Sequence, residues 1–297
     1  MMTMMTAASK QGKGVTTSLA PTSHPSTVNP THTRTTVTSS PIASPTATPF
    51  TNGVQYTGGM VLTTPIVFLV WYGAWTGPAD ATVQLVELFL QSLSHTAYQN
   101  ILSLYYMQNA TDKTYVGPTI GFGGSAFVGY PHGPNITRAN MNSVVENVID
   151  SGLLVYNAQG VYLFLTSGDV LFPPICSGAC GFHSGYSTMF GSIALATVGF
   201  ATACPNGCAP LVAFANSVHG RLVDGFINVL SHELFVLITS PWNSGWTGVD
   251  AKCQWTFGEL LFDLNNRTYN VVLGNEKFTV QREWVNSAGG YCAFQYP

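Results

Sequence analysis

The sequence predicts a layered α/β protein, with α+β as the alternative, preceded by a disordered segment. Segments of strand length and helix length alternate after residue 54, and hydrophobic residues make up 46% of the 297, enough for one sizeable core. Residues 1–50 contain Ser, Thr or Pro at 26 positions and no acidic residue. Such a composition cannot bury enough apolar surface to fold. We therefore expect a disordered leader, 1–50, and a single globular domain, 51–297.

The first strand and helix of the globular part are predicted from residues 65–93. Residues 65–72 are β-branched or aromatic on both alternating faces, which is typical of a strand buried on both sides. Pro78 then opens a helix that Thr76 or Gly77 caps. The residues expected on its inner face are Leu85, Leu88, Phe89 and Leu93.

The next elements continue this alternation. The Gly-rich segment 117–129 predicts strand and loop, and Thr137 caps a second helix that ends near Asp150. Two more apolar strands are expected at 160–166 and 192–200. Strands that alternate with helices predict helices packed on one sheet.

Charge and hydropathy argue against a nucleic-acid partner and against a membrane span. Charged residues make up only 8% of the chain, and all 13 acidic residues lie after position 50, against seven Lys and Arg there. A weakly acidic body without basic runs offers no binding surface for nucleic acid. The most apolar stretches, 65–72 and 226–239, are too short or too interrupted to span a bilayer, so no membrane span is expected.

Six cysteines predict three disulfides. They form two close pairs and one distant pair, and all six are assigned to disulfides: Cys176, Cys180, Cys204, Cys208, Cys253 and Cys292. The alternative joins the two Cys-x3-Cys units in a four-thiolate zinc site. Two observations favour disulfides. The count is even, and the distant pair would close a loop of about 40 residues and stabilise the fold by about 3–4 kcal/mol. The segment around this last pair, after Thr247, is expected to form short strands and turns.

Low charge and disulfides indicate an extracellular protein. N-glycan acceptor triplets begin at Asn109, Asn135 and Asn266, in keeping with a secreted glycoprotein. The sequence begins Met1-Met2-Thr3-Met4-Met5 and shows no clear apolar core of a signal peptide. Localisation is therefore predicted from composition alone.

The segment 223–241 is the one most able to carry chemistry. It predicts a hydrophobic helix ended by Ser240 and Pro241. Asp224, Asn228 and His232 stand four residues apart and form one polar stripe. His232 followed by Glu233 resembles the zincin pattern, in which His binds zinc and Glu activates a metal-bound water.

That chemistry has a structural alternative. The second zinc ligand of the pattern would stand at position 236, which is Val236. His232 is then a buried, hydrogen-bonded histidine and Glu233 a packing partner near Trp242 or Trp246. In the metal hypothesis Asp224 or Asn228 orients His232, and ligands come from elsewhere in the chain, the candidates being His183, His219, Asp250, Glu259 and Asp263. A third class is a carbohydrate-binding module that uses exposed tryptophans such as Trp242, Trp246 and Trp255.

These residues resemble the exordium, or phosphate-induced protein, family. The matching blocks are Trp71-Tyr72-Gly73, residues 161–170, Cys176-x3-Cys180-Gly181-x-His183, Cys204-Pro205-x-Gly207-Cys208 and Val223-Asp224-Gly225-x-Ile227-Asn228. The resemblance implies an extracellular or cell-wall protein linked in plants to growth and nutrient status, without an established activity. Microbial relatives resemble zincins more closely, with Ser-His-Glu-Leu-x-Glu followed by Thr-Asp-Pro. This chain has Val236 and Ser240 at the two acidic positions.

The sequence therefore predicts a zincin-like layered domain closed by disulfides. We expect a secreted or cell-surface exordium-like protein without catalysis or cofactor, associated with wall polysaccharide or another extracellular component. The enzyme alternative is a zinc metallopeptidase-like hydrolase that uses His232 as metal ligand and Glu233 as catalytic base.

Overall fold

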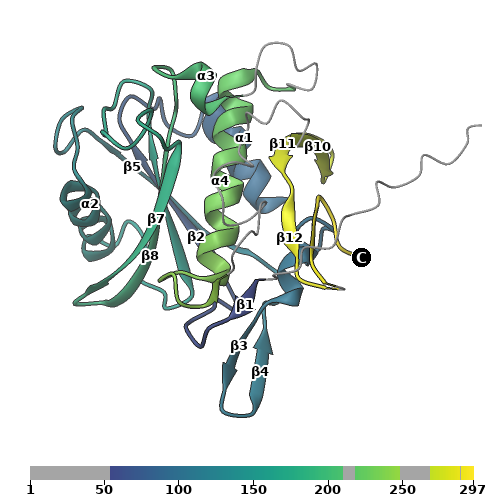
Figure 1. Ribbon diagram of the computed structural model, residues 1–297. Helices are drawn as coiled ribbons and strands as arrows, with labels where there is room; N and C mark the ends of the chain where they lie inside the picture. Colours follow the sequence, from purple (N-terminus) through teal and green to yellow (C-terminus); the bar gives the residue numbers. More distant parts are fainter. Residues whose placement is uncertain (1–53, 210–217, 248–267, 288) are drawn as a thin grey trace, which may run out of the picture. The chain divides into compact units, whose positions relative to one another are not determined.

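The computed structural model describes residues 54–209, 218–247, 268–287 and 289–297, all within one compact unit, Thr46–Pro297 (Figure 1). The predicted leader lies outside these described residues, as do six residues named above: Asp250, Cys253, Trp255, Glu259, Asp263 and Asn266. Helices and strands mix along the described chain, which confirms the predicted combination of α and β structure. The predicted likeness to zincins stays a prediction.

A five-stranded sheet forms the centre of the unit. Its strand order is β5-β2-β6-β8-β7. The bounds are β2 Ile66–Tyr72, β5 Gly121–Gly129, β6 Gly160–Thr166, β7 Gly181–Thr188 and β8 Gly191–Gly199. Four strands run parallel, whereas the edge strand β7 pairs antiparallel with β8. Parallel strands need crossover connections, which here contain the first two helices.

Alternation along the buried strands supplies both faces of the sheet. In β2, Val67, Leu69 and Trp71 pack with helices α1 (Ala81–Gln91) and α4 (Arg221–Thr239). The residues between them pack with helix α2 (Arg138–Asp150) in a second core cluster. Figure 1 accordingly shows α2 on the opposite side of the sheet from α4. The period of two in side-chain direction thus builds a helix–sheet–helix sandwich.

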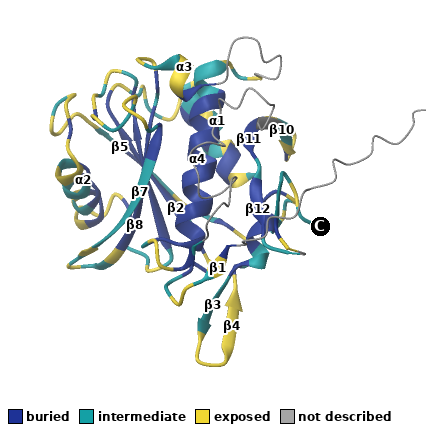
Figure 2. Cartoon of the chain, viewed as in Figure 1, coloured by how far each residue is buried: buried dark blue, intermediate teal, exposed yellow. Residues whose placement is uncertain are grey.

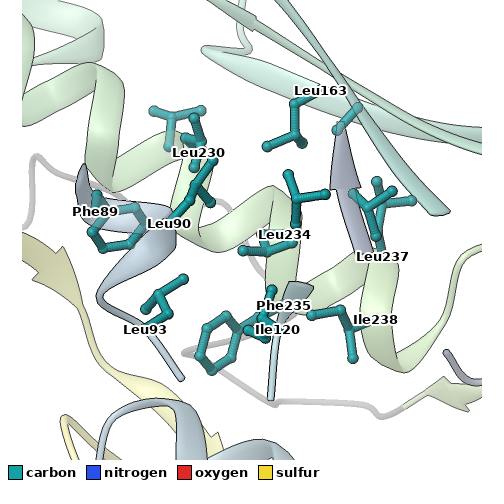
Figure 3. Close-up of a cluster of buried hydrophobic side chains, with 14 of the residues drawn as sticks. Phe89, Leu90, Leu93, Ile120, Leu163, Leu230, Leu234, Phe235, Leu237 and Ile238 are labelled. Atoms are coloured by element: carbon teal, nitrogen blue, oxygen red, sulfur yellow. The ribbon is translucent and has the colours of Figure 1, made fainter. Parts of the chain in front are cut away.

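Helix α4 is buried on all sides because a second β layer covers the side that faces away from the sheet. It contacts β6, β7 and β8 on one side and β11 (Glu276–Gln281) on the other. Figures 2 and 3 show the buried helix and its contacts with α1 through Leu230 and Leu234. A helix that is hydrophobic all round suits such a position. With 19 residues and a mean hydropathy of 1.5 over its most apolar stretch, the helix is long and apolar enough to cross a membrane. However, 89% of the residues in that stretch are buried inside the unit.

Smaller elements surround these layers. A hairpin of β3 (Tyr106–Asn109) and β4 (Asp112–Tyr115) extends from the body, and β1 (Gln55–Tyr56) pairs with β9 (Trp246–Thr247). The others are η1 Gln99–Leu104, α3 Pro205–Cys208, β10 Thr268–Leu273, β12 Glu283–Val285 and β13 Tyr291–Ala293. The short strands expected after Thr247 are therefore confirmed in the described part.

The two Cys-x3-Cys units are joined to each other. Cys176 bonds to Cys204 and Cys180 to Cys208, and both bonds span 28 residues of sequence. Cys292 is disulfide-bonded as well, while its predicted partner Cys253 is outside the described residues. The prediction of disulfides rather than zinc is confirmed for these described cysteines. Reading each close pair as one bond is wrong, because only the pairing of the two units brings their sulfur atoms together.

The sequence predicts the start of helix α2 better than that of helix α1. The predicted cap of α2 is confirmed by a reciprocal capping box, in which Thr137 Oγ1 accepts from Asn140 N (3.2 Å) and Asn140 Oδ1 accepts from Thr137 N (2.9 Å). The predicted cap of α1 is wrong, because Asp80 caps it through Thr82 N. Its predicted inner face is confirmed for Phe89 and Leu93, which are buried, and Leu85 packs against the core, but Leu88 is wrong because it is 42% exposed. The face that meets the core carries Val83, Val86, Phe89 and Leu90.

Candidate functional site

The polar stripe of α4 does not act as one site. Asp224 accepts hydrogen bonds from Val218 N (2.9 Å) and His219 N (3.3 Å), so it closes the turn that enters the helix. Asn228 is fully buried, and its side-chain atoms make no hydrogen bond with any described residue. His232 lies two turns beyond Asp224. Asp224 thus has a local structural use, and its predicted role in orienting His232 stays a prediction.

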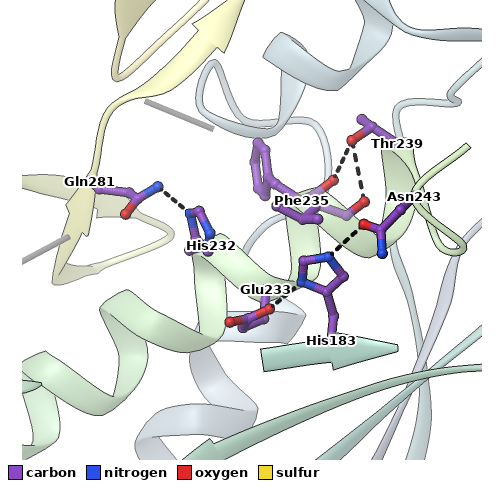
Figure 4. A network of polar contacts seen from close by, with 8 residues as sticks. His183, His232, Glu233, Phe235, Thr239, Asn243 and Gln281 are labelled. Atoms are coloured by element: carbon purple, nitrogen blue, oxygen red, sulfur yellow. Dashed lines mark hydrogen bonds and ion pairs between the residues drawn. The ribbon is translucent and has the colours of Figure 1, made fainter. Parts of the chain in front are cut away.

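His232 points to the C-terminal β layer. The Gln281 Nε2 amide lies 2.7 Å from His232 Nδ1 and donates to it, which makes Nδ1 the unprotonated ring nitrogen (Figure 4). His232 is 2% exposed. Burial lowers its pKa, as does the nearby His183, although the negative charge of Glu233 opposes this. The imidazole is therefore held neutral.

Glu233 points in a different direction, to the edge strand β7. Its Oε2 lies 2.8 Å from His183 Nδ1, and His183 Nε2 lies 3.1 Å from Asn243 Oδ1 (Figure 4). Both ring nitrogens of His183 thus face acceptors, an arrangement that fits a protonated imidazolium. Burial lowers the pKa of His183, but the hydrogen bond and charge of Glu233 and the hydrogen bond to Asn243 outweigh burial and raise it.

Glycines on β7 make room for this ion pair. A Cβ at Gly181 would lie 2.8 Å from Glu233 Oε1, and one at Gly185 would lie 1.9 Å from the Trp242 ring. The indole therefore lies directly against the strand. The His183 side chain keeps 16% of its surface exposed, whereas Glu233 has none. The result is a buried carboxylate whose charge is balanced by an imidazolium that reaches the surface.

Metal ligation requires several donors around one point. Among the residues that the structure describes, no group of three or more His, Cys, Asp or Glu side chains could hold a metal ion. His232 and Glu233 are directed to different layers, and Val236 is buried, with 1% exposed. His219, another predicted donor, lies 2.8 Å from the Lys277 carbonyl oxygen. The donors of the metal hypothesis are thus dispersed in the described part of the chain.

The sequence points to His232 and Glu233 as candidate site residues but does not reveal the residues that they contact. The sequence offers His183 only as one of several distant candidate ligands, and it does not point to Gln281 or Asn243. The sole local signal was the block Cys180-Gly181-x-His183, in which the disulfide and the small glycine set β7 against α4. Of the predicted glycan acceptors, Asn109 and Asn135 are exposed, as glycosylation requires.

The two histidines are expected to give opposite pH dependences of stability. His183 has a raised pKa, so its contribution is present below its unfolded value of 6.5 and is lost as the pH rises through the folded value. His232 has a lowered pKa, so it destabilises the fold as the pH falls below 6.5. As the pH falls from about 8 to about 5.5, the free energy of unfolding of His183→Gln should decrease more steeply than that of the wild type. That of His232→Gln should decrease less steeply. Urea unfolding across this range measures both slopes, and identical slopes in the two variants would contradict the assignment.

The comparisons with known proteins agree with the residues quoted above. The family model described as the conserved region of phosphate-induced protein 1 matches residues 54–263. Protein EXORDIUM-like 3 of Arabidopsis thaliana is 28% identical over 288 residues, which cover 80% of this chain and 82% of that protein. Protein EXORDIUM-like 5 of the same plant is 28% identical over 280 residues, covering 78% and 75%. No solved structure matches. Because the family model covers more than half of the chain, this protein belongs to the phosphate-induced protein 1 family.

Proposed function

We propose that this protein is a secreted or cell-surface exordium-like protein that binds a component of the cell wall or extracellular matrix without catalysis, in growth or nutrient response. One observation carries the non-catalytic part: His232 and Glu233 contact different layers of the fold. His232 is held by Gln281, and Glu233 by His183. Both side chains have thus acquired structural partners, where a zincin site would need them to meet at one metal-bound water.

The disulfides are compatible with an oxidising, extracellular setting. Family membership adds support, because two relatives that are covered over most of their length are named as exordium-like proteins. The zinc metallopeptidase alternative would need Glu233 to leave its ion pair with His183 before it could act as a base. No contact in the described part of the chain favours that step.

The hairpin β3–β4 offers a surface suited to polysaccharide. Its register pairs Tyr106 with Tyr115 and Gln108 with Lys113, so these four side chains share one face. Tyr115 is 51% exposed and packs edge-to-face on Tyr106, with 5.3 Å between the ring centroids. The Tyr106 ring lies 5.4 Å from that of Tyr56. Aromatic rings beside amide and ammonium donors match the apolar faces and hydroxyls of sugars. The predicted use of Trp246 does not fit, because only 4% of it is exposed.

Binding to insoluble wall polysaccharide tests this proposal. The full chain should sediment with at least one of cellulose, xylan or a β-1,3-glucan, and Tyr115→Ala should lower the bound fraction several-fold. Tyr115→Phe is the matched control, because it keeps the ring and removes only the hydroxyl. Failure to sediment with any wall fraction, or release of peptides from a general protease substrate that Glu233→Gln abolishes, would overturn the proposal.

A further inference from the structure

A cavity of about 520 Å³ lies at the carboxyl ends of β6 and β8. The strand ends Thr166 and Gly199 form its floor, the segments 135–137 and 170–177 form two walls, and Phe200, Ala201 and Ala203 form the third. The volume is within the usual range for small-molecule sites. The carboxyl ends of parallel strands are also where α/β sheets bind ligands. None of the lining residues belongs to the His183–Glu233 pair.

The walls of this cavity are tied to one another. The disulfide Cys176–Cys204 joins the segment 170–177 to the wall that contains Ala203. Two backbone hydrogen bonds, Ile136 N to Leu171 O (3.0 Å) and Leu171 N to Pro134 O (2.7 Å), join the segment 170–177 to the wall that contains residues 135–137. Thr202 Oγ1 also donates to Gly168 O at 2.6 Å. A cavity held open in this way costs little to organise when a ligand binds.

The lining specifies the chemistry of the ligand. It contains no Asp, Glu, Lys, Arg or His, and most of its surface comes from aliphatic and aromatic side chains, including Phe172 and Phe200. An ion placed here would lose hydration without gaining a counter-charge. A sugar would leave most of its hydroxyls without partners, because the polar side chains are few: Asn135, Thr137, Thr166 and Ser177. Thr166 is buried at the floor, whereas Thr137 and Ser177 are exposed at the rim.

We propose that this cavity binds an uncharged, mostly apolar small molecule whose polar end, a hydroxyl or carbonyl, lies near Thr137 and Ser177. The apolar part of the ligand lies between Phe172 and Phe200. Leu171, which is 58% exposed, lines the mouth and covers the ligand when the site is filled. This site is separate from the tyrosine face of the β3–β4 hairpin and goes beyond the function proposed above.

Fluorescence titration with the neutral probe N-phenyl-1-naphthylamine tests the site in the intact, disulfide-bonded chain. The probe should brighten on binding, and decan-1-ol should displace it while decanoate at neutral pH does not. Ala203→Trp should weaken probe binding about tenfold or more, because the indole fills the cavity. Ala79→Trp is the matched control, since Ala79 is an equally exposed alanine outside the lining. Asn135→Gln, titrated alongside, removes any glycan from the rim.

A second variant guards against misfolding. Leu171→Asp alters an exposed side chain and should fold, yet it places a charge at the mouth and should weaken binding of the neutral probe several-fold. No brightening with the wild type, or equal binding by the wild type and both cavity variants, would overturn the proposal. Displacement by decanoate as effective as by decan-1-ol would overturn the uncharged class. Displacement by a soluble oligosaccharide such as cellohexaose would show a sugar site instead.

Discussion

Removing both disulfides between the Cys-x3-Cys units should lower the free energy of unfolding by about 6 kcal/mol. The bonds interleave, since Cys176 pairs with Cys204 and Cys180 with Cys208. When one remains, removing the other frees only a short loop of about eight residues and costs about 2–3 kcal/mol. The double loss also opens the 28-residue loop, so it should exceed the sum of the single losses. That loss is comparable with the total stability of many domains.

Chemical unfolding of the variants Cys176→Ala/Cys204→Ala, Cys180→Ala/Cys208→Ala and the quadruple alanine variant measures this effect. Alanine avoids a new buried hydroxyl at Cys180 and Cys208, both 5% exposed. The wild type in reductant should approach the quadruple variant, apart from the further bond at Cys292. A single-pair variant that is as unstable as the quadruple variant would contradict the interleaved loops.

Replacing His183 by alanine should lower the free energy of unfolding by about 3–5 kcal/mol, because it leaves the Glu233 carboxylate buried without a counter-charge. Glu233 has no exposed side-chain surface, and its Oε1 already lacks a hydrogen bond to any described residue. Adding Glu233→Gln to His183→Ala should recover part of the loss, since a buried amide costs less than a buried charge. Urea unfolding of the two single variants and the double variant completes the cycle.

Additive losses would mean that His183 and Glu233 do not interact. A coupled loss would show that the His183–Glu233 ion pair stabilises the packing of β7 against α4. Surface replacements rarely cost more than about 0.5 kcal/mol. The loss expected for His183→Ala, whose side chain is 16% exposed, is several times larger, so urea unfolding can distinguish additive from coupled losses.

Much of the fold could be predicted because its signals are local. The buried strand β2, the capping box of α2 and the end of α4 each depend on residues within a few positions of one another. Strand β7 gave no such signal. Its sequence, Gly181–Thr188, is rich in Gly and Ser, and only pairing with β8 makes it a strand. The inner face of α1 could be predicted only in part for a related reason, because tertiary packing decides that Val83 and not Leu88 is buried.

The site was harder to predict because its contacts are long-range. Glu233 and His183 are 50 residues apart, and His232 and Gln281 are 49 apart. His232 and Glu233 are adjacent residues of one helix, so their side chains point about 100° apart. The sequence could not show that β layers cover both sides of that helix. This arrangement gives each residue its own partner, and no periodicity within α4 reveals it.

We propose that helix α4, with His232 and Glu233, is a structural element of the core and not a metal centre. Elemental mass spectrometry of the dialysed protein, for the wild type beside His232→Ala, tests this most directly. We predict less than stoichiometric zinc in both samples. One zinc ion per chain in the wild type that is lost in His232→Ala would contradict the account and favour the metallopeptidase alternative.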